Sequence, residues 1–105
     1  MSETVGVCPL RELAAGTMRL VEWEDVEILV ANCDGEILAM QNRCSHDNGP
    51  LNEGTLDPSA CTVKCPRHGS IFDLRSGHAV RPPASVPLDT FPVHVEDEEI
   101  RLEVQ

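Results

Sequence analysis

Two short segments that each pair a cysteine with a histidine constrain this chain more than any other feature. Cys44 and His46 stand one residue apart, Cys65 and His68 stand two residues apart, and eighteen residues separate the two pairs. Together they read C-x-H-x18-C-x-x-H and offer two thiolates and two imidazoles. The pattern predicts a metal centre held between two loops, with one thiolate and one imidazole supplied by each loop.

Two kinds of metal centre use two cysteines and two histidines. Structural zinc sites do so, but they usually pair cysteine with cysteine and histidine with histidine. In this chain each pair is mixed, and only one residue separates the members of the first pair. A Rieske [2Fe–2S] centre, in which two histidines replace two cysteines on one iron, fits mixed pairs better. Zinc stays open as the alternative.

The residues that follow each histidine resemble the two cluster-binding loops of Rieske ferredoxins, the small electron carriers of non-heme iron oxygenase systems. Asp-Asn-Gly-Pro-Leu follows the first histidine and Gly-Ser-Ile-Phe-Asp follows the second. The resemblance implies one [2Fe–2S] cluster, with Cys44 and Cys65 on the inner iron and His46 and His68 on the outer, more exposed iron. The groups that it implies as hydrogen-bond donors to the sulfides are Ser70 and the backbone around Asn48, Gly49 and Gly69.

The rest of the chain is patterned as short strands. An almost continuous apolar run over 27–33 reaches Asp34-Gly35, and a second run covers 36–41, which predicts a hairpin with a two-residue turn. Apolar residues at every second position over 91–95 and again over 100–104 predict a closing hairpin with one buried face. The only helical candidate is Pro9 to Ala15, with a proline in its first turn and Gly16 at its end.

These patterns predict an all-β chain with a single domain over residues 1–105, because no repeat, linker or low-complexity tract divides it. The resemblance implies the Rieske fold, a sandwich of three small antiparallel sheets with an inserted cluster-binding subdomain at about 42–74. Pro82-Pro83 resembles a proline-bearing loop that covers the cluster in this family. A stiff connector is the alternative, since further prolines stand at 87 and 92.

Charge and cysteine content limit the partners and the compartment. The net charge of −10 disfavours nucleic acid and anionic membranes, and it suits either docking on basic patches or simple solubility. No apolar run reaches the roughly 20 residues of a membrane span, and the N-terminus lacks signal-peptide features, so we expect a cytoplasmic protein. The odd remainder of Cys8, Cys33 and Cys61 predicts free thiols in a reducing compartment. Cys8 and Cys33 are interpreted as buried apolar residues, and Cys61 receives no role.

The resemblance implies a one-electron carrier, not an enzyme. It would pass electrons from an NAD(P)H-dependent flavoprotein reductase to a terminal oxygenase, docking transiently and electrostatically near His46 and His68. A catalytic oxygenase would need a second iron held by two histidines and a carboxylate, and only His78 and His94, both interpreted as surface residues, remain. Two alternatives stay open: a small subunit of a reductase such as assimilatory nitrite reductase, and a carrier linked to iron–sulfur assembly.

The loops also predict a low reduction potential. Rieske proteins of the respiratory-complex type resemble this pattern but carry two further cysteines, joined in a disulfide, where this chain has Gly49 and Arg67. They also often carry a tyrosine, which donates to a ligand sulfur, where this chain has Phe72. Fewer donors to sulfur make an added electron less favourable, so we expect a potential on the order of −150 mV, at the bottom of the Rieske range.

Overall fold

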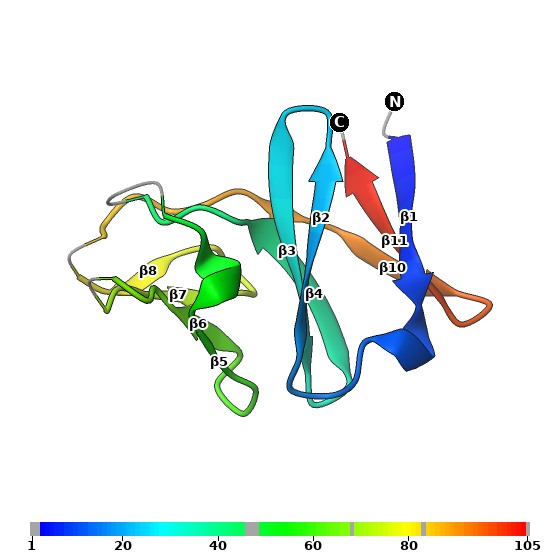
Figure 1. Cartoon of the computed structure of the whole chain (residues 1–105), viewed down its shortest axis with the longest axis horizontal. Helices are drawn as coiled ribbons and strands as arrows, with labels where there is room; N and C mark the ends of the chain where they lie inside the picture. The colour runs from blue at the N-terminus through cyan, green and yellow to red at the C-terminus, as the bar shows by residue number, and fades with distance from the viewer. Residues whose placement is uncertain (1–2, 46–48, 68, 83, 105) are drawn as a thin grey trace.

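The computed structural model describes residues 3–45, 49–67, 69–82 and 84–104, and strands make up most of its regular structure (Figure 1). These described residues form three antiparallel sheets, which confirms the expected all-β architecture. Sheet A has the order β1-β11-β10, sheet B the order β2-β3-β4-β9, and sheet C the order β5-β6-β7-β8. The bounds are β1 Glu3–Pro9, β2 Met18–Trp23, β3 Val26–Cys33, β4 Glu36–Gln41, β5 Thr55–Asp57, β6 Thr62–Lys64, β7 Ile71–Asp73, β8 Ala79–Arg81, β9 Thr90–Phe91, β10 Val93–Glu96 and β11 Glu99–Val104.

The hairpin expected at Asp34-Gly35 is confirmed. β3 and β4 pair with Cys33 opposite Glu36, and both turn residues have positive φ, 55° at Asp34 and 106° at Gly35. A type I′ turn requires positive φ at both of its central positions, which is why the Asp-Gly pair identified it.

Strand β3 separates two hydrophobic cores, and this explains its almost continuous apolar sequence. Ile28 and Val30 pack with residues of sheet A, whereas Leu29 and Ala31 pack with residues of sheet C. A strand that is buried on both faces does not show the apolar–polar alternation of a half-exposed strand. One face of β3 therefore contributes to the core with sheet A, and its other face contributes to the core with sheet C.

The closing hairpin is present, but it divides between two sheets at Pro92. β9 pairs with β4 in sheet B, while β10 pairs with β11 in sheet A. Proline has no N–H to donate to a strand ladder, which suits the position where the chain leaves one sheet for the next. One detail of the expectation is wrong: the side of β10 that carries Val95 is not fully buried, and Val95 is 45% exposed.

The helical candidate over Pro9 to Ala15 is wrong as an α-helix. Pro9 ends β1, and only the single 3₁₀ turn η1 (Leu10–Glu12) follows. Gly16 has a φ of 83°, so the expected stop is there but the helix is not. A second 3₁₀ turn, η2 (Leu51–Glu53), precedes β5. The part of the chain that the structure describes contains no helix long and apolar enough to cross a membrane.

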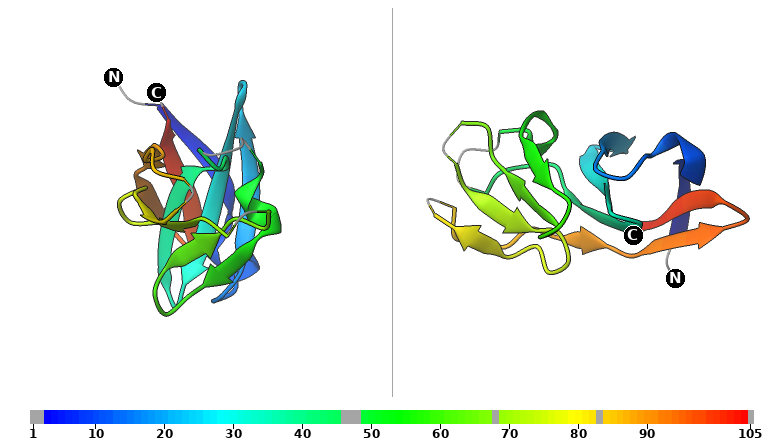
Figure 2. Two further views of the ribbon diagram at one scale, coloured as in Figure 1. Left: turned by 90° about the vertical axis from the view of Figure 1, so that its left-hand side faces the viewer. Right: turned by 90° about the horizontal axis from the view of Figure 1, so that it is seen from below.

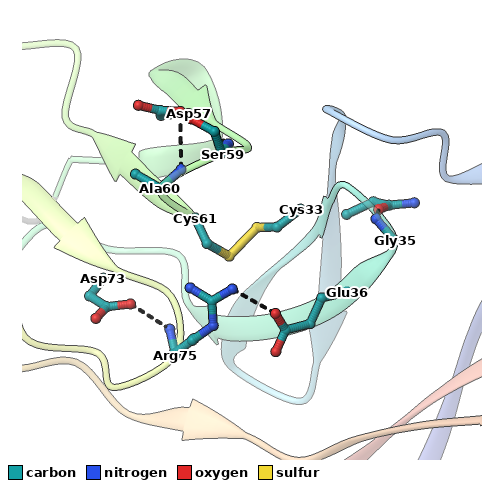
Figure 3. Close-up of a disulfide and its surroundings, with 10 residues drawn as sticks. Cys33, Gly35, Glu36, Asp57, Ser59, Ala60, Cys61, Asp73 and Arg75 are labelled. Atoms are coloured by element: carbon teal, nitrogen blue, oxygen red, sulfur yellow. Dashed lines mark hydrogen bonds and ion pairs between the residues drawn. A yellow bond between two sulfur atoms is a disulfide. The ribbon is translucent and has the colours of Figure 1, made fainter.

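Sheet C forms a separate lobe beside sheets A and B (Figure 2). A disulfide between Cys33, at the end of β3, and Cys61, in the β5–β6 turn, joins sheet B to sheet C (Figure 3). The expectation of free thiols at Cys33 and Cys61 is therefore wrong. The sequence did not predict this pairing, because cysteines 28 residues apart can pair only if the fold brings them together, and their spacing does not show that it does. With Cys33 and Cys61 joined, the cysteine count no longer indicates a reducing compartment, and the cytoplasmic location stays a prediction.

A second link between the lobes lies beside the disulfide (Figure 3). The Arg75 guanidinium, just after β7, donates to the Glu36 carboxylate at the start of β4, with 2.6 Å between nitrogen and oxygen. This hydrogen bond, together with the charge of Glu36, raises the pKa of Arg75. Because both side chains are half exposed, the pair adds little stability compared with the covalent bond next to it.

Candidate cluster-binding site

The two cysteine-containing loops are closed by the same kind of backbone hydrogen bond. The Cys44 N–H donates to the Gly49 carbonyl at 2.8 Å, and the Cys65 N–H donates to the Ser70 carbonyl at 2.7 Å. In both loops the cysteine is joined to the residue five positions later, although the loops differ in sequence and in the position of the histidine. The two loops are therefore closed by equivalent backbone hydrogen bonds.

The two cysteines that head these loops are buried in one hydrophobic core. Cys44 is 0% exposed and Cys65 is 1% exposed, and both belong to the core cluster that contains Leu51, Phe72 and Ala84. Thiols from two loops that lie in the same dry core can bind a soft metal centre and protect it from water. His46, His68 and Asn48, which the sequence also assigned to the site, lie outside the described residues. Among the described residues no three metal-binding side chains gather at one point.

The proline-bearing segment 82–89 lies against both loops. The Ser45 hydroxyl of the first loop donates to the Val86 carbonyl at 2.7 Å. The Ala84 N–H donates to the Ser70 hydroxyl oxygen, beside the second loop, at 3.0 Å in a buried position. The segment is therefore attached to both loops, where the resemblance placed a cover. Pro83 lies outside the described residues. The contact through Ser45 was not foreseen, because a serine between two ligands gives no signal of its own.

Ser70 supports the fit between this site and an iron–sulfur cluster. Its side chain is fully buried, and its oxygen accepts from Ala84, so the hydroxyl proton is directed elsewhere. Within the described residues that proton reaches no acceptor. A buried hydroxyl normally donates to a partner, and the sulfides of a [2Fe–2S] cluster would supply one. The two buried thiols and this donor fit the cysteine half of the ligand set and the sulfide environment of such a cluster.

Two glycines near the second loop are needed for different reasons, one for its backbone conformation and the other for close packing. Gly69 has a φ of 78°, and a Cβ added there would meet Cε of Lys64 at 3.7 Å, so the lysine stem lies over the loop. A Cβ at Gly54, between η2 and β5, would stand only 1.9 Å from the Lys64 carbonyl oxygen. Only glycine allows the chain before β5 to approach β6 this closely.

The remaining cysteine and histidines take no part in the site. Cys8 is buried in the other core, between sheets A and B, as expected for an apolar residue. His78 and His94 are exposed, which confirms their interpretation as surface residues. His94 contacts the Glu103 carboxylate on the neighbouring strand.

Residues 3–92 match the Rieske [2Fe-2S] domain family, and the chain belongs to that family. A curated relative, the 3-phenylpropionate/cinnamic acid dioxygenase ferredoxin subunit of Photorhabdus laumondii, is 44% identical over 98 residues, covering 93% of this chain and 91% of the relative. Its counterpart in Escherichia coli strain K12 is 39% identical over 97 residues, 92% of this chain and 90% of the relative. These relatives confirm the prediction of a ferredoxin, which carries electrons and does not itself catalyse the oxygenation.

Solved structures show the same fold. The ferredoxin of carbazole 1,9a-dioxygenase from Nocardioides aromaticivorans IC177 superposes with a TM-score of 0.93 at 26% identity, covering 97% of this chain and 98% of that one. A ferredoxin in complex with the oxygenase of carbazole 1,9a-dioxygenase has a TM-score of 0.90 at 30% identity, covering 95% of this chain and 92% of that one. In that structure a protein similar to this chain is bound to its oxygenase.

Proposed function

We propose that this protein is a one-electron carrier that takes electrons from an NAD(P)H-dependent flavoprotein reductase and delivers them to a terminal non-heme iron oxygenase in the cytoplasm. The observation that carries the proposal is the pair of matching loops, each headed by a buried cysteine of the same core. The dioxygenase ferredoxin subunits among its relatives, and the complex of a similar ferredoxin with an oxygenase, support the choice of partner class.

Cys44, His46, Cys65 and His68 would hold one [2Fe–2S] cluster. When bound, the cluster supplies a site that accepts and releases a single electron. The thiolates of Cys44 and Cys65 would anchor it on the buried side, where both cysteines are almost inaccessible to water. The two imidazoles would occupy the exposed side, so a partner that docks near His46 and His68 would receive the electron over a short distance.

The surrounding residues keep this site dry and fixed. Phe72 and Leu51 are fully buried against the cysteines and exclude water from the inner side. The segment 82–89 ties the loops together through Ser45 and Ser70, which limits how far one loop moves relative to the other. A site that moves little on gaining charge is suited to repeated electron transfer.

The test compares two cysteines of similar burial. We expect the purified wild-type protein to contain two irons and two acid-labile sulfides per chain, and to give a Rieske-type EPR signal when reduced. Cys65→Ser should lose the iron and the signal, whereas Cys8→Ser, in the other core, should keep both. Stoichiometric zinc in protein made with ample iron would contradict the proposal. So would substrate oxidation by the chain alone with NAD(P)H and O₂.

A further inference from the structure

The net charge of the protein is divided unequally between its two lobes. The segment between β4 and β9, residues 42–89, carries five acidic and five basic residues. The remaining residues, which form sheets A and B, carry thirteen acidic and three basic residues. The entire net charge of −10 therefore belongs to the lobe that does not contain the cysteine loops.

Within sheet C, the strand register places basic and acidic residues at opposite ends. Lys64 pairs with Ile71, and Ile71 pairs with Arg81, at the end of the sheet from which the second loop emerges. Asp57 and Asp73 both pair with Thr62, at the opposite end of the same strands. The exposed bases thus lie at the end of the sheet next to the second loop, and these two acids lie at the other end.

Two further features complete this surface. Arg67, which is exposed, belongs to the second loop itself, and the stem of Lys64 lies over Gly69 of the same loop. Val86 is 59% exposed, and its carbonyl accepts from Ser45 of the first loop. These four exposed residues, Lys64, Arg67, Arg81 and Val86, lie next to the two loops or at the adjoining end of sheet C, and we call them the tip face.

The most acidic part of the other lobe is too distant to control docking at the tip face. The molecule is 39 Å long, and its most acidic turn, between β10 and β11, lies at the opposite end from sheet C (Figure 1). At physiological ionic strength, charges are screened over about 8 Å. A partner in contact with the second loop therefore experiences the charges of the cysteine lobe, where Lys64, Arg67 and Arg81 lie closest to that loop, rather than the net charge.

We propose that the tip face docks on a surface of the terminal oxygenase that is acidic around an apolar centre. Val86 is the apolar contact, and Lys64, Arg67 and Arg81 provide the charge complementarity that orients the approach. This inference rests on the proposed function and specifies its partner surface. The proposed partner surface is acidic, whereas the net charge of −10 alone would indicate a basic partner surface.

The experiment measures how fast the reduced protein reduces a purified oxygenase, as a function of oxygenase concentration, at about 0.15 M ionic strength. The probe is the oxygenase of the 3-phenylpropionate/cinnamic acid dioxygenase of Photorhabdus laumondii, whose ferredoxin subunit is 44% identical to this chain. Lys64→Glu and Arg81→Glu are compared with Arg11→Glu, on the exposed turn η1 of the acidic lobe. All three variants change the net charge equally and differ only in its position.

We expect Lys64→Glu and Arg81→Glu to raise the half-saturating oxygenase concentration about five-fold each, and Arg11→Glu to leave it unchanged. The rate at saturation reveals any accompanying change in redox potential, because that change would persist when docking is complete. For the apolar contact, Val86→Asp should weaken docking, while Val95→Asp, an exposed valine of sheet A, should not.

The outcomes separate this inference from the proposed function. If the tip variants dock as well as Arg11→Glu, or dock more tightly than the wild type, the tip face is not matched to an acidic surface and the inference is wrong. The proposed function would survive either result, because electron transfer would still occur. If the reduced wild-type protein fails to reduce the oxygenase at every concentration of the oxygenase, the proposed function itself is wrong.

Discussion

The two lobes of this protein are held together by different means. Sheets A and B contain strands of six to eight residues, such as β3 and β11, which pair along their whole length. Every strand of sheet C has only three residues. Strands this short bury little surface and form few ladder bonds, so the cysteine lobe depends on its loop closures, the segment 82–89 and the disulfide to sheet B. One lobe is stabilised by regular strand pairing and the other by specific links outside its strand ladders.

The sharpest way to break this comparison is to remove the disulfide. Replacing Cys33 and Cys61 together with serine should lower the unfolding free energy by about 3 kcal/mol, since the bond closes a loop of moderate length in the unfolded chain. Denaturant unfolding of the iron-loaded protein measures the change. A reducing agent should destabilise the wild-type protein by a similar amount and leave the double variant unaffected. Equal sensitivity of both proteins would show that the disulfide does not hold the lobes together.

A substitution of glycine by alanine tests the dense packing of the cysteine lobe. Gly54→Ala places a Cβ 1.9 Å from the Lys64 carbonyl oxygen and should cost about 2 kcal/mol, since the backbone must move to relieve the overlap. Gly6→Ala in β1 is the control, because its Cβ would meet only the end of the Arg101 side chain at 3.7 Å. Thermal and denaturant unfolding compare the two variants. Similar losses in both would mean that the two lobes are packed alike.

The only two phenylalanines of the chain provide a test of how each lobe affects the cluster. Phe72→Tyr should raise the reduction potential from about −150 mV by about 40 mV, because one hydrogen bond to a ligand sulfur is worth about 1 kcal/mol. Phe91→Tyr, in β9 beside the other core, should leave the potential unchanged. Protein-film voltammetry measures both. A wild-type potential above zero would contradict the interpretation of the loops.

The smallest expected effect concerns the β5–β6 turn. A hydrogen bond from the Ser59 hydroxyl, together with the backbone N–H groups of Ala60 and Ser59, lowers the pKa of Asp57. A carboxyl group whose pKa is lowered by folding stabilises the folded state at pH values above its ordinary pKa. This contribution is lost as the pH falls through the pKa of the folded state. Wild-type protein should therefore lose slightly more stability than Asp57→Asn on acidification below about pH 4. Parallel acid-unfolding curves would count against this.

The sequence predicted regular pairing well and long-range links poorly. The β3–β4 hairpin followed from Asp34-Gly35 because the turn chemistry is local. The ligand cysteines followed from their spacing to the histidines, and the structure buries both, although their role as ligands stays a proposal. The disulfide could not be predicted, since Cys33 and Cys61 meet only when both lobes are assembled. The expected helix after Pro9 failed because one 3₁₀ turn suffices to lead the chain from sheet A to sheet B.

The position of β3 between two cores has a consequence for engineering. A designer who wished to graft the cysteine lobe onto another scaffold would naturally cut at the ends of residues 42–89. Leu29, Ala31 and Cys33 belong to the same core as Cys44 and Cys65, so that cut would remove one wall of the site. Keeping β3 would in turn expose Ile28 and Val30, which need sheet A as cover. The smallest transplantable module is therefore close to the whole chain.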